Sequence, residues 1–162
     1  MTETEMKLRD AATQMKIALS HVAEEEIVRS CVNSYISAAR SVTFVMQRES
    51  SDNPELKAWY EKEMLTMKTV PLLRFFNEKR VYSIHKGVVA PTTHVAPIKD
   101  LTVNGVPTTG DGTMTFLRFE GAEEFFPGGS GGVFRLCEQY FIVLKDLVGA
   151  WRRKRTELGI HN

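Results

Sequence analysis

Apolar residues recur at steps of three and four over most of this chain, which is the spacing of one face of an α-helix. The pattern predicts helices from about residue 7 to 22, from the acidic residues 24–26 to about 46, from 54 to 69, between 71 and 87, and from 133 to 155. Amphipathic helices bury their apolar stripes by packing against one another. We therefore expect a mainly α fold with a small antiparallel β insert before the last helix.

Proline and glycine mark where several of these helices begin and end. Asp52 or Asn53 can cap a helix whose first residue is Pro54, because proline is tolerated in the first turn. Pro71 predicts a kink or a short break after that helix, and Pro71 and Gly87 bracket a further helix of about four turns. The residues expected in the core are Leu19, Val32, Tyr35, Val42, Phe76, Tyr140, Leu144 and Leu147.

The helix expected between Pro71 and Gly87 combines an apolar stripe with a charged cluster. Phe75, Phe76 and Val81 are expected to face the core. Arg80 and His85 lie near the C-terminal end, where the helix dipole favours positive charge. An arginine and a histidine in this position can bind a phosphate, so chemistry is expected here.

The region from about residue 92 to 119 loses the helical period and is rich in β-branched residues, proline and glycine. Asn104-Gly105 separates two short apolar runs and predicts a hairpin turn. The run from Phe125 to Gly132 lacks the lysine of a phosphate-binding loop, so it is expected to be a hinge, with Ser130 capping the last helix. The insert is interpreted either as a dimerisation arm or as a cover over the site.

Length and composition limit the class of protein. One domain over residues 1–162 is expected, and its net charge of +1 provides no general field for a polyanion, so nucleic acid would need a local basic patch. Cys31 and Cys137 lie in apolar helical patterns without a metal-ligand spacing, which favours a reducing compartment. No apolar run is long enough for a membrane helix, and the acidic start is unlike a secretory signal. We expect a cytoplasmic protein with no membrane association, cofactor or metal.

Two further basic groups leave alternatives open. Arg40 is either a solvated or salt-bridged surface residue or a second basic group beside the Arg80 site. Four consecutive cations follow Trp151, which suits a helix C-terminus but exceeds what capping needs. Arg152 and Arg153 are therefore candidates for phosphate binding as well as for helix capping.

The spacing Arg80-x-x-x-x-His85 resembles the signature of the HEPN superfamily. The runs from Ser37 to Val45 and from Phe76 to Arg80 also occur in the order in which such domains place their second and third helices. The resemblance covers roughly residues 8 to 87 and 130 to 157. It implies a HEPN-like four-helix bundle, and many members of that superfamily are metal-independent ribonucleases in which two subunits form a composite cleft. A homodimer with RNA or a nucleotide as its ligand is thus implied by the resemblance.

The resemblance also assigns residue roles. His85 would act as general acid or base on a ribose 2′-hydroxyl, and Arg80 would stabilise charge on the phosphate. The candidate binding residues are Arg40, Glu78, Tyr82, Arg152 and Arg153.

Val81 leaves two classes of function open, because it stands where those ribonucleases usually carry a polar residue. An apolar residue at this position favours a non-catalytic scaffold or a regulatory, nucleic-acid-associated module. The alternative is a toxin-like, metal-independent endoribonuclease that uses Arg80 and His85 and has an antitoxin-like protein as its partner. Binding of a small nucleotide is a third option.

Overall fold

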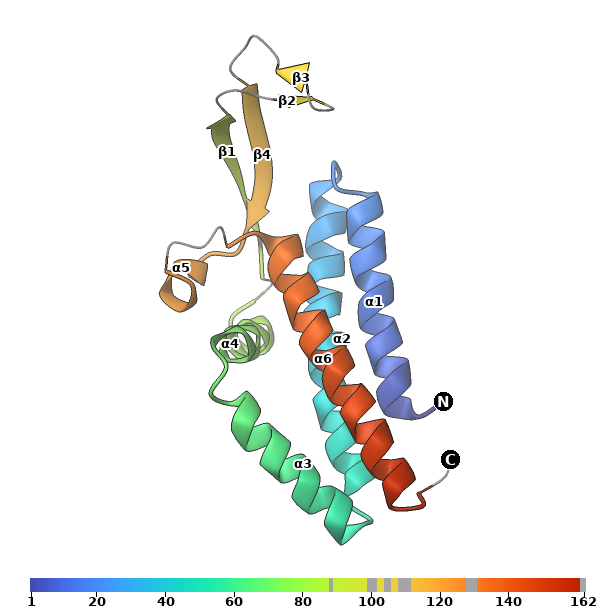
Figure 1. The fold of residues 1–162 in the computed structure, drawn as a ribbon. Coiled ribbons are helices and arrows are strands. Elements are labelled where there is room, and N and C mark those ends of the chain that lie inside the picture. Colours follow the sequence, from blue (N-terminus) through green and yellow to red (C-terminus); the bar gives the residue numbers. More distant parts are fainter. Residues whose placement is uncertain (88, 99–101, 104–105, 108–111, 128–130, 161–162) are drawn as a thin grey trace. The chain divides into compact units, whose positions relative to one another are not determined.

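The computed structural model in Figure 1 describes residues 1–87, 89–98, 102–103, 106–107, 112–127 and 131–160. The chain divides into two compact units. One is a helical unit formed by Met1–Val89 and Phe134–Asn162, and the other is a β-containing unit formed by Ala90–Val133. The mainly α class is confirmed, as is the small antiparallel β element before the last helix.

Five long helices supply the helical unit. They are α1 (Glu3–Ser20), α2 (Glu25–Ser50), α3 (Pro54–Met67), α4 (Pro71–His85) and α6 (Val133–Glu157). The backbone amides of Glu3 and Thr4, at the start of α1, donate to the carboxylate of Glu49 near the end of α2. These contacts require α1 and α2 to run antiparallel.

Two buried hydrogen bonds join α2 to α6. The Tyr35 hydroxyl donates to the Cys137 carbonyl at 2.6 Å, and the Trp151 indole N–H donates to the Ser50 hydroxyl at 3.0 Å. The first contact is near the start of α6 and the second near its end, so α2 and α6 run in the same direction. Burial raises the pKa of both Tyr35 and Cys137 far above their ordinary values, which keeps these groups neutral.

The helix boundaries follow the local signals in the sequence. Asn53 caps α3, because its side-chain oxygen accepts hydrogen bonds from Glu55 and Leu56 at 3.0 Å each, and Pro54 is the first helical residue. Of the kink or short break expected at Pro71, the structure has the break, since α3 ends at Met67 and α4 begins at Pro71.

The core contains most of the residues that the periodicity placed there. Seven expected core residues are buried: Val32, Tyr35, Val42, Phe76, Tyr140, Leu144 and Leu147. Phe76 stacks on Tyr140 with ring centroids 4.3 Å apart, and Tyr35 meets both rings edge-on. Aromatic packing between α2, α4 and α6 therefore forms the centre of the unit.

Two expected core residues are exposed, so these predictions are wrong. Leu19 is 55% exposed because α1 buries the small residues Ala11 and Ala18, one face over from the apolar stripe predicted for it. Small side chains allow the backbones of α1 and α2 to approach closely. Val81 is 45% exposed, since Phe75 and Phe76 already occupy the buried face of α4.

Asn33 of α2 fixes the point where the chain leaves the helical unit. Its side-chain amide donates to the Val89 carbonyl at 2.8 Å and accepts from the Val89 amide at 3.0 Å. Val89 is buried, and these paired bonds satisfy both of its backbone groups. The end of the helical unit is thus held by a side chain 56 residues earlier.

The β-containing unit is built on a long strand pair. β1 (Thr92–Ile98) pairs antiparallel with β4 (Gly112–Arg118), from Thr92↔Arg118 to Ile98↔Gly112. The two-residue strands β2 (Thr102–Val103) and β3 (Val106–Pro107) pair with each other. A short helix that was not predicted, α5 (Ala122–Phe125), follows. The expected Asn104-Gly105 turn and the Ser130 cap lie outside the described residues.

Candidate functional site

The exposed face of α4 carries three of the candidate residues. Glu78, Tyr82 and His85 are exposed and follow one another at helical steps of four and three, so they share one face. Val81 is exposed beside them. Arg80 is half-buried, and residues five apart on a helix differ by about 140° in direction and about 7.5 Å in height. The helix therefore directs Arg80 and His85 to different faces.

The positive charge of Arg80 affects the pKa of a tyrosine of α6. Burial raises the pKa of Tyr140 to about 12, and the positive charges of Arg40 and Arg80 oppose this rise. Arg40 comes from α2 and Arg80 from α4. Two guanidinium groups from different helices are thus close enough to influence the same phenol.

A cavity of about 640 Å³ lies between α2, α3, α4 and α6. Its polar lining includes Arg40 and Thr43 of α2, Tyr60 of α3, Arg74 and Asn77 of α4, and Tyr140 of α6. Neither Arg80 nor His85 belongs to the lining. Arg80 nevertheless lies three residues after Asn77 on α4, so it continues the same helical stripe.

Hydrogen bonds hold the polar side of this cavity in place. The Arg40 guanidinium donates to the Thr43 hydroxyl at 2.6 Å, and that hydroxyl donates to the Arg40 carbonyl at 3.1 Å. The Tyr60 hydroxyl donates to the Thr43 carbonyl at 2.9 Å. Burial raises the pKa of Tyr60, while the charge of Arg40 lowers it, which places the guanidinium near this phenol as well.

The cavity is positively charged on balance and apolar on one side. Among the described residues that line it, Arg40, Lys68 and Arg74 carry positive charge and Glu61 carries negative charge. The apolar lining residues are Met64, Leu65, Met67 and Leu73. Such a combination suits a molecule with an anionic group and an apolar part.

The basic end of α6 is a separate region of the helical unit. Arg152 and Arg153 are exposed and lie at least twelve residues after Tyr140, about 18 Å along the helix axis. Arg152 pairs with Glu5 of α1 at 3.2 Å. The structure therefore does not bring these two arginines to the cavity.

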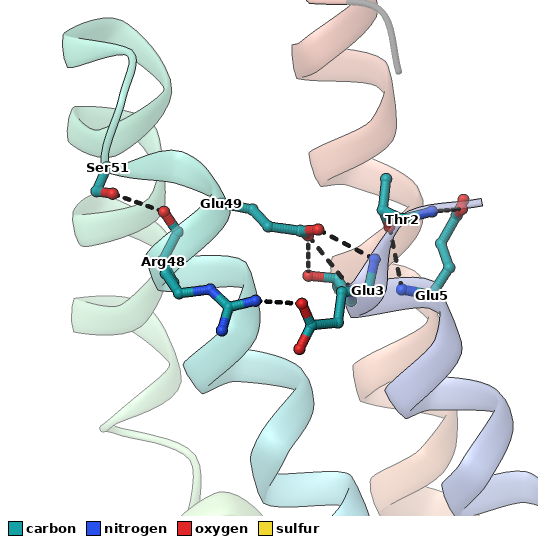
Figure 2. A network of polar contacts seen from close by, with 7 residues as sticks. Thr2, Glu3, Glu5, Arg48, Glu49 and Ser51 are labelled. Atoms are coloured by element: carbon teal, nitrogen blue, oxygen red, sulfur yellow. Dashed lines mark hydrogen bonds and ion pairs between the residues drawn. The ribbon is translucent and has the colours of Figure 1, made fainter.

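Figure 2 shows a polar network that the sequence did not predict, at the start of α1. The Glu49 carboxylate accepts hydrogen bonds from the Glu3 and Thr4 amides at 3.0 and 3.3 Å and from the Thr4 hydroxyl at 2.6 Å. Arg48 pairs with Glu3, and Thr2 and Glu5 form a capping box. This network secures the end of α1 against α2 and is structural in character.

Sequence reasoning also missed Tyr60, Arg74 and Asn77 as site residues. One signal was present, because Arg74, Asn77 and Arg80 recur every three residues and form a polar stripe on α4. The position of Tyr60 had no such signal, since its contact with Thr43 depends on how α3 packs against α2.

Two features are absent from the part of the chain that the structure describes. In that part of the chain, no group of three or more His, Cys, Asp or Glu side chains is placed to hold a metal ion. None of its helices has the length and hydropathy of a membrane span.

The fold and the cavity define a helical protein with a basic, partly apolar site between α2, α3, α4 and α6. The chain belongs to the family of bacteriophage lambda protein ea47, whose family model matches residues 1–90. The match covers α1 to α4, and so three of the four helices that line the cavity. Comparisons with curated proteins and with solved structures found no match.

Proposed function

We propose that this protein is a HEPN-like, homodimeric helical module that binds RNA or a nucleotide at the basic cavity and does not cut it. The observation that carries the proposal is the basic lining of the cavity, to which α2 contributes Arg40 and α4 contributes Arg74, with Lys68 after the end of α3. Guanidinium groups bind phosphate through paired, charge-assisted hydrogen bonds.

The arrangement of α4 favours binding over catalysis. A general acid and the group that stabilises phosphate charge must reach the same reacting centre. Arg80 is half-buried and His85 is exposed, and positions five apart on α4 point about 140° away from each other. Val81, in place of the usual polar neighbour of the arginine, supports the same conclusion.

A second candidate function is metal-independent cleavage of RNA. It is favoured by the shared exposed face of Glu78, Tyr82 and His85, which a second subunit can cover. In the superfamily that the chain resembles, two subunits build one cleft. Arg80 and His85 would then act across the dimer, and an antitoxin-like protein would be the partner that controls the activity.

We also propose a cytoplasmic location. Cys31 and Cys137 are both buried free thiols, which suits a reducing compartment.

Binding and cleavage of a short fluorescein-labelled single-stranded RNA separate the two functions. By fluorescence anisotropy, Arg40→Gln and Arg74→Gln should each weaken binding on the order of tenfold, because each removes a charge-assisted contact. Arg9→Gln is the matched control, since Arg9 is an exposed arginine of α1. His85→Ala should bind as the wild type does.

The same RNA should remain intact in the presence of EDTA. Cleavage by the wild type that His85→Ala loses would contradict the binding proposal and establish the nuclease. Equal cleavage by both proteins would identify a contaminating enzyme. Unchanged anisotropy for Arg40→Gln and Arg74→Gln would remove the cavity from the proposal.

A further inference from the structure

The volume of the cavity fits a ligand of about one nucleotide. Its volume of about 640 Å³ is within the range of small-molecule sites, which is about 300–1,000 Å³. Residues of four helices line it, so a ligand that fills it contacts several elements at once and need not be longer than one nucleotide. One end of a nucleic acid, or a free nucleotide, therefore fits better than an internal segment.

The charged residues that line the cavity favour a doubly charged anion. Arg40, Lys68 and Arg74 face the cavity together with the acidic Glu61. A phosphomonoester carries a charge of about −1.5 to −2 at neutral pH, whereas a phosphodiester within a chain carries one negative charge. Three cations thus favour a terminal phosphate over an internal one.

Arg40 is prepared for such a contact. Its bond to Thr43 fixes the guanidinium, and a guanidinium has five N–H donors, so further donors remain for an anion. Fixing the side chain before binding lowers the entropy lost when the ligand arrives. Arg74 can approach the same anion from α4.

The rest of the lining suits a nucleobase. Met64, Leu65 and Met67 offer an apolar wall from α3, and methionine adapts to flat, polarisable groups. The side-chain amides of Gln47 and Asn77 both donate and accept hydrogen bonds, as the edges of bases require. Inorganic phosphate would leave this wall and these amides without a partner.

We infer that the cavity binds a single nucleotide bearing a terminal phosphomonoester, with the phosphate at Arg40 and Arg74 and the base against the α3 wall. This inference rests on the proposed function, because it names the ligand of the same site. The nucleotide comes either from the end of an RNA or from the free mononucleotide pool.

Isothermal titration calorimetry on the full chain tests the ligand class. The titrants are adenosine 5′-monophosphate, adenosine, inorganic phosphate, and one RNA oligonucleotide with either a 5′-phosphate or a 5′-hydroxyl. Adenosine 5′-monophosphate should bind at least tenfold more tightly than adenosine or phosphate. The 5′-phosphorylated RNA should exceed the 5′-hydroxyl form by a similar factor if RNA ends are the source, whereas equal binding of the two RNAs identifies the free mononucleotide.

Two matched pairs of variants test the geometry. Arg74→Ala should weaken binding of adenosine 5′-monophosphate on the order of tenfold, whereas Arg9→Ala should not change it. Leu65→Ser should weaken binding of the nucleotide and leave that of inorganic phosphate unchanged, with Leu19→Ser as the control. Leu65 and Leu19 are 66% and 55% exposed, so neither change disturbs the core.

Several results would overturn the inference. Equal affinity for phosphate and for adenosine 5′-monophosphate would exclude the base from the site, and unchanged binding by Arg74→Ala would place the ligand elsewhere. If RNA binds but adenosine 5′-monophosphate does not, the inference fails while the proposed function stands. If neither binds, both fail.

Discussion

The Trp151 indole N–H donates to the Ser50 hydroxyl, and both residues are completely buried. Ser50 in turn donates to the Met46 carbonyl at 2.7 Å, so one hydroxyl joins the last turn of α2 to the far end of α6. Replacing this hydroxyl would leave a buried indole N–H without its partner.

Ser50→Ala should therefore lower the free energy of unfolding by about 1–3 kcal/mol. Urea denaturation followed by circular dichroism measures the change. Ser51→Ala is the matched control, because Ser51 is exposed and bonds only locally to the Arg48 carbonyl, and it should change stability by less than about 0.5 kcal/mol. Equal losses in the two variants would mean that the Trp151 contact contributes nothing.

Glu49→Gln should loosen the start of α1. The neutral amide presents one acceptor oxygen in place of two, so the Glu3 and Thr4 amides lose part of their cap, at a cost of about 1 kcal/mol. Hydrogen exchange should accelerate at these two amides first. Glu138→Gln, an exposed change on α6, should leave exchange in α1 as it is, and faster exchange throughout the chain would argue against a local cap.

Stability should fall in alkaline solution through the buried tyrosines. The pKa of Tyr140 is raised by burial from 10.0 to about 12, so the unfolded chain ionises first as the pH rises. The stability that neutral Tyr140 contributes is complete below about pH 10 and is lost as the pH rises toward about 12. Tyr140→Phe should lose less stability than the wild type when urea denaturation is compared at about pH 8 and pH 11. Identical losses would show that Tyr140 does not contribute.

The proposed homodimer has a simple physical test. Multi-angle light scattering at micromolar concentration should give twice the 18.3 kDa mass of one chain. A mass near that of one chain would contradict the dimer and, with it, the composite ribonuclease site. Binding of a nucleotide in the cavity of one subunit would be unaffected by this result.

Local signals predicted the parts of the fold that depend on neighbouring residues. Asn53 and Pro54 begin α3, and Pro71 begins α4, because capping and proline geometry act over a few residues. Leu19 was misplaced because the face that α1 buries is decided by its fit against α2. A period of three to four residues does not distinguish two adjacent faces of one helix when one of them is lined by alanine.

The candidate site was predictable only as a region. Of the two arginines chosen from the sequence on α2 and α4, Arg40 lines the cavity and Arg80 does not. The cavity beside them also needs Tyr60 and Arg74, which come from helices whose packing the sequence does not encode locally. The spacing of Arg80 and His85 does not predict that they meet, since an arginine and a histidine five residues apart in one helix point in different directions.

The helical unit is discontinuous along the chain, and this has a consequence during synthesis. A ribosome releases α1 to α4 first, then the β-containing unit, and only then α6. Until α6 emerges, Tyr35 and Phe76 lack the Tyr140 ring against which they pack. The aromatic core is therefore incomplete, and exposed to aggregation, during translation of the β-containing unit. The helical unit can complete its fold only after α6 has been synthesised.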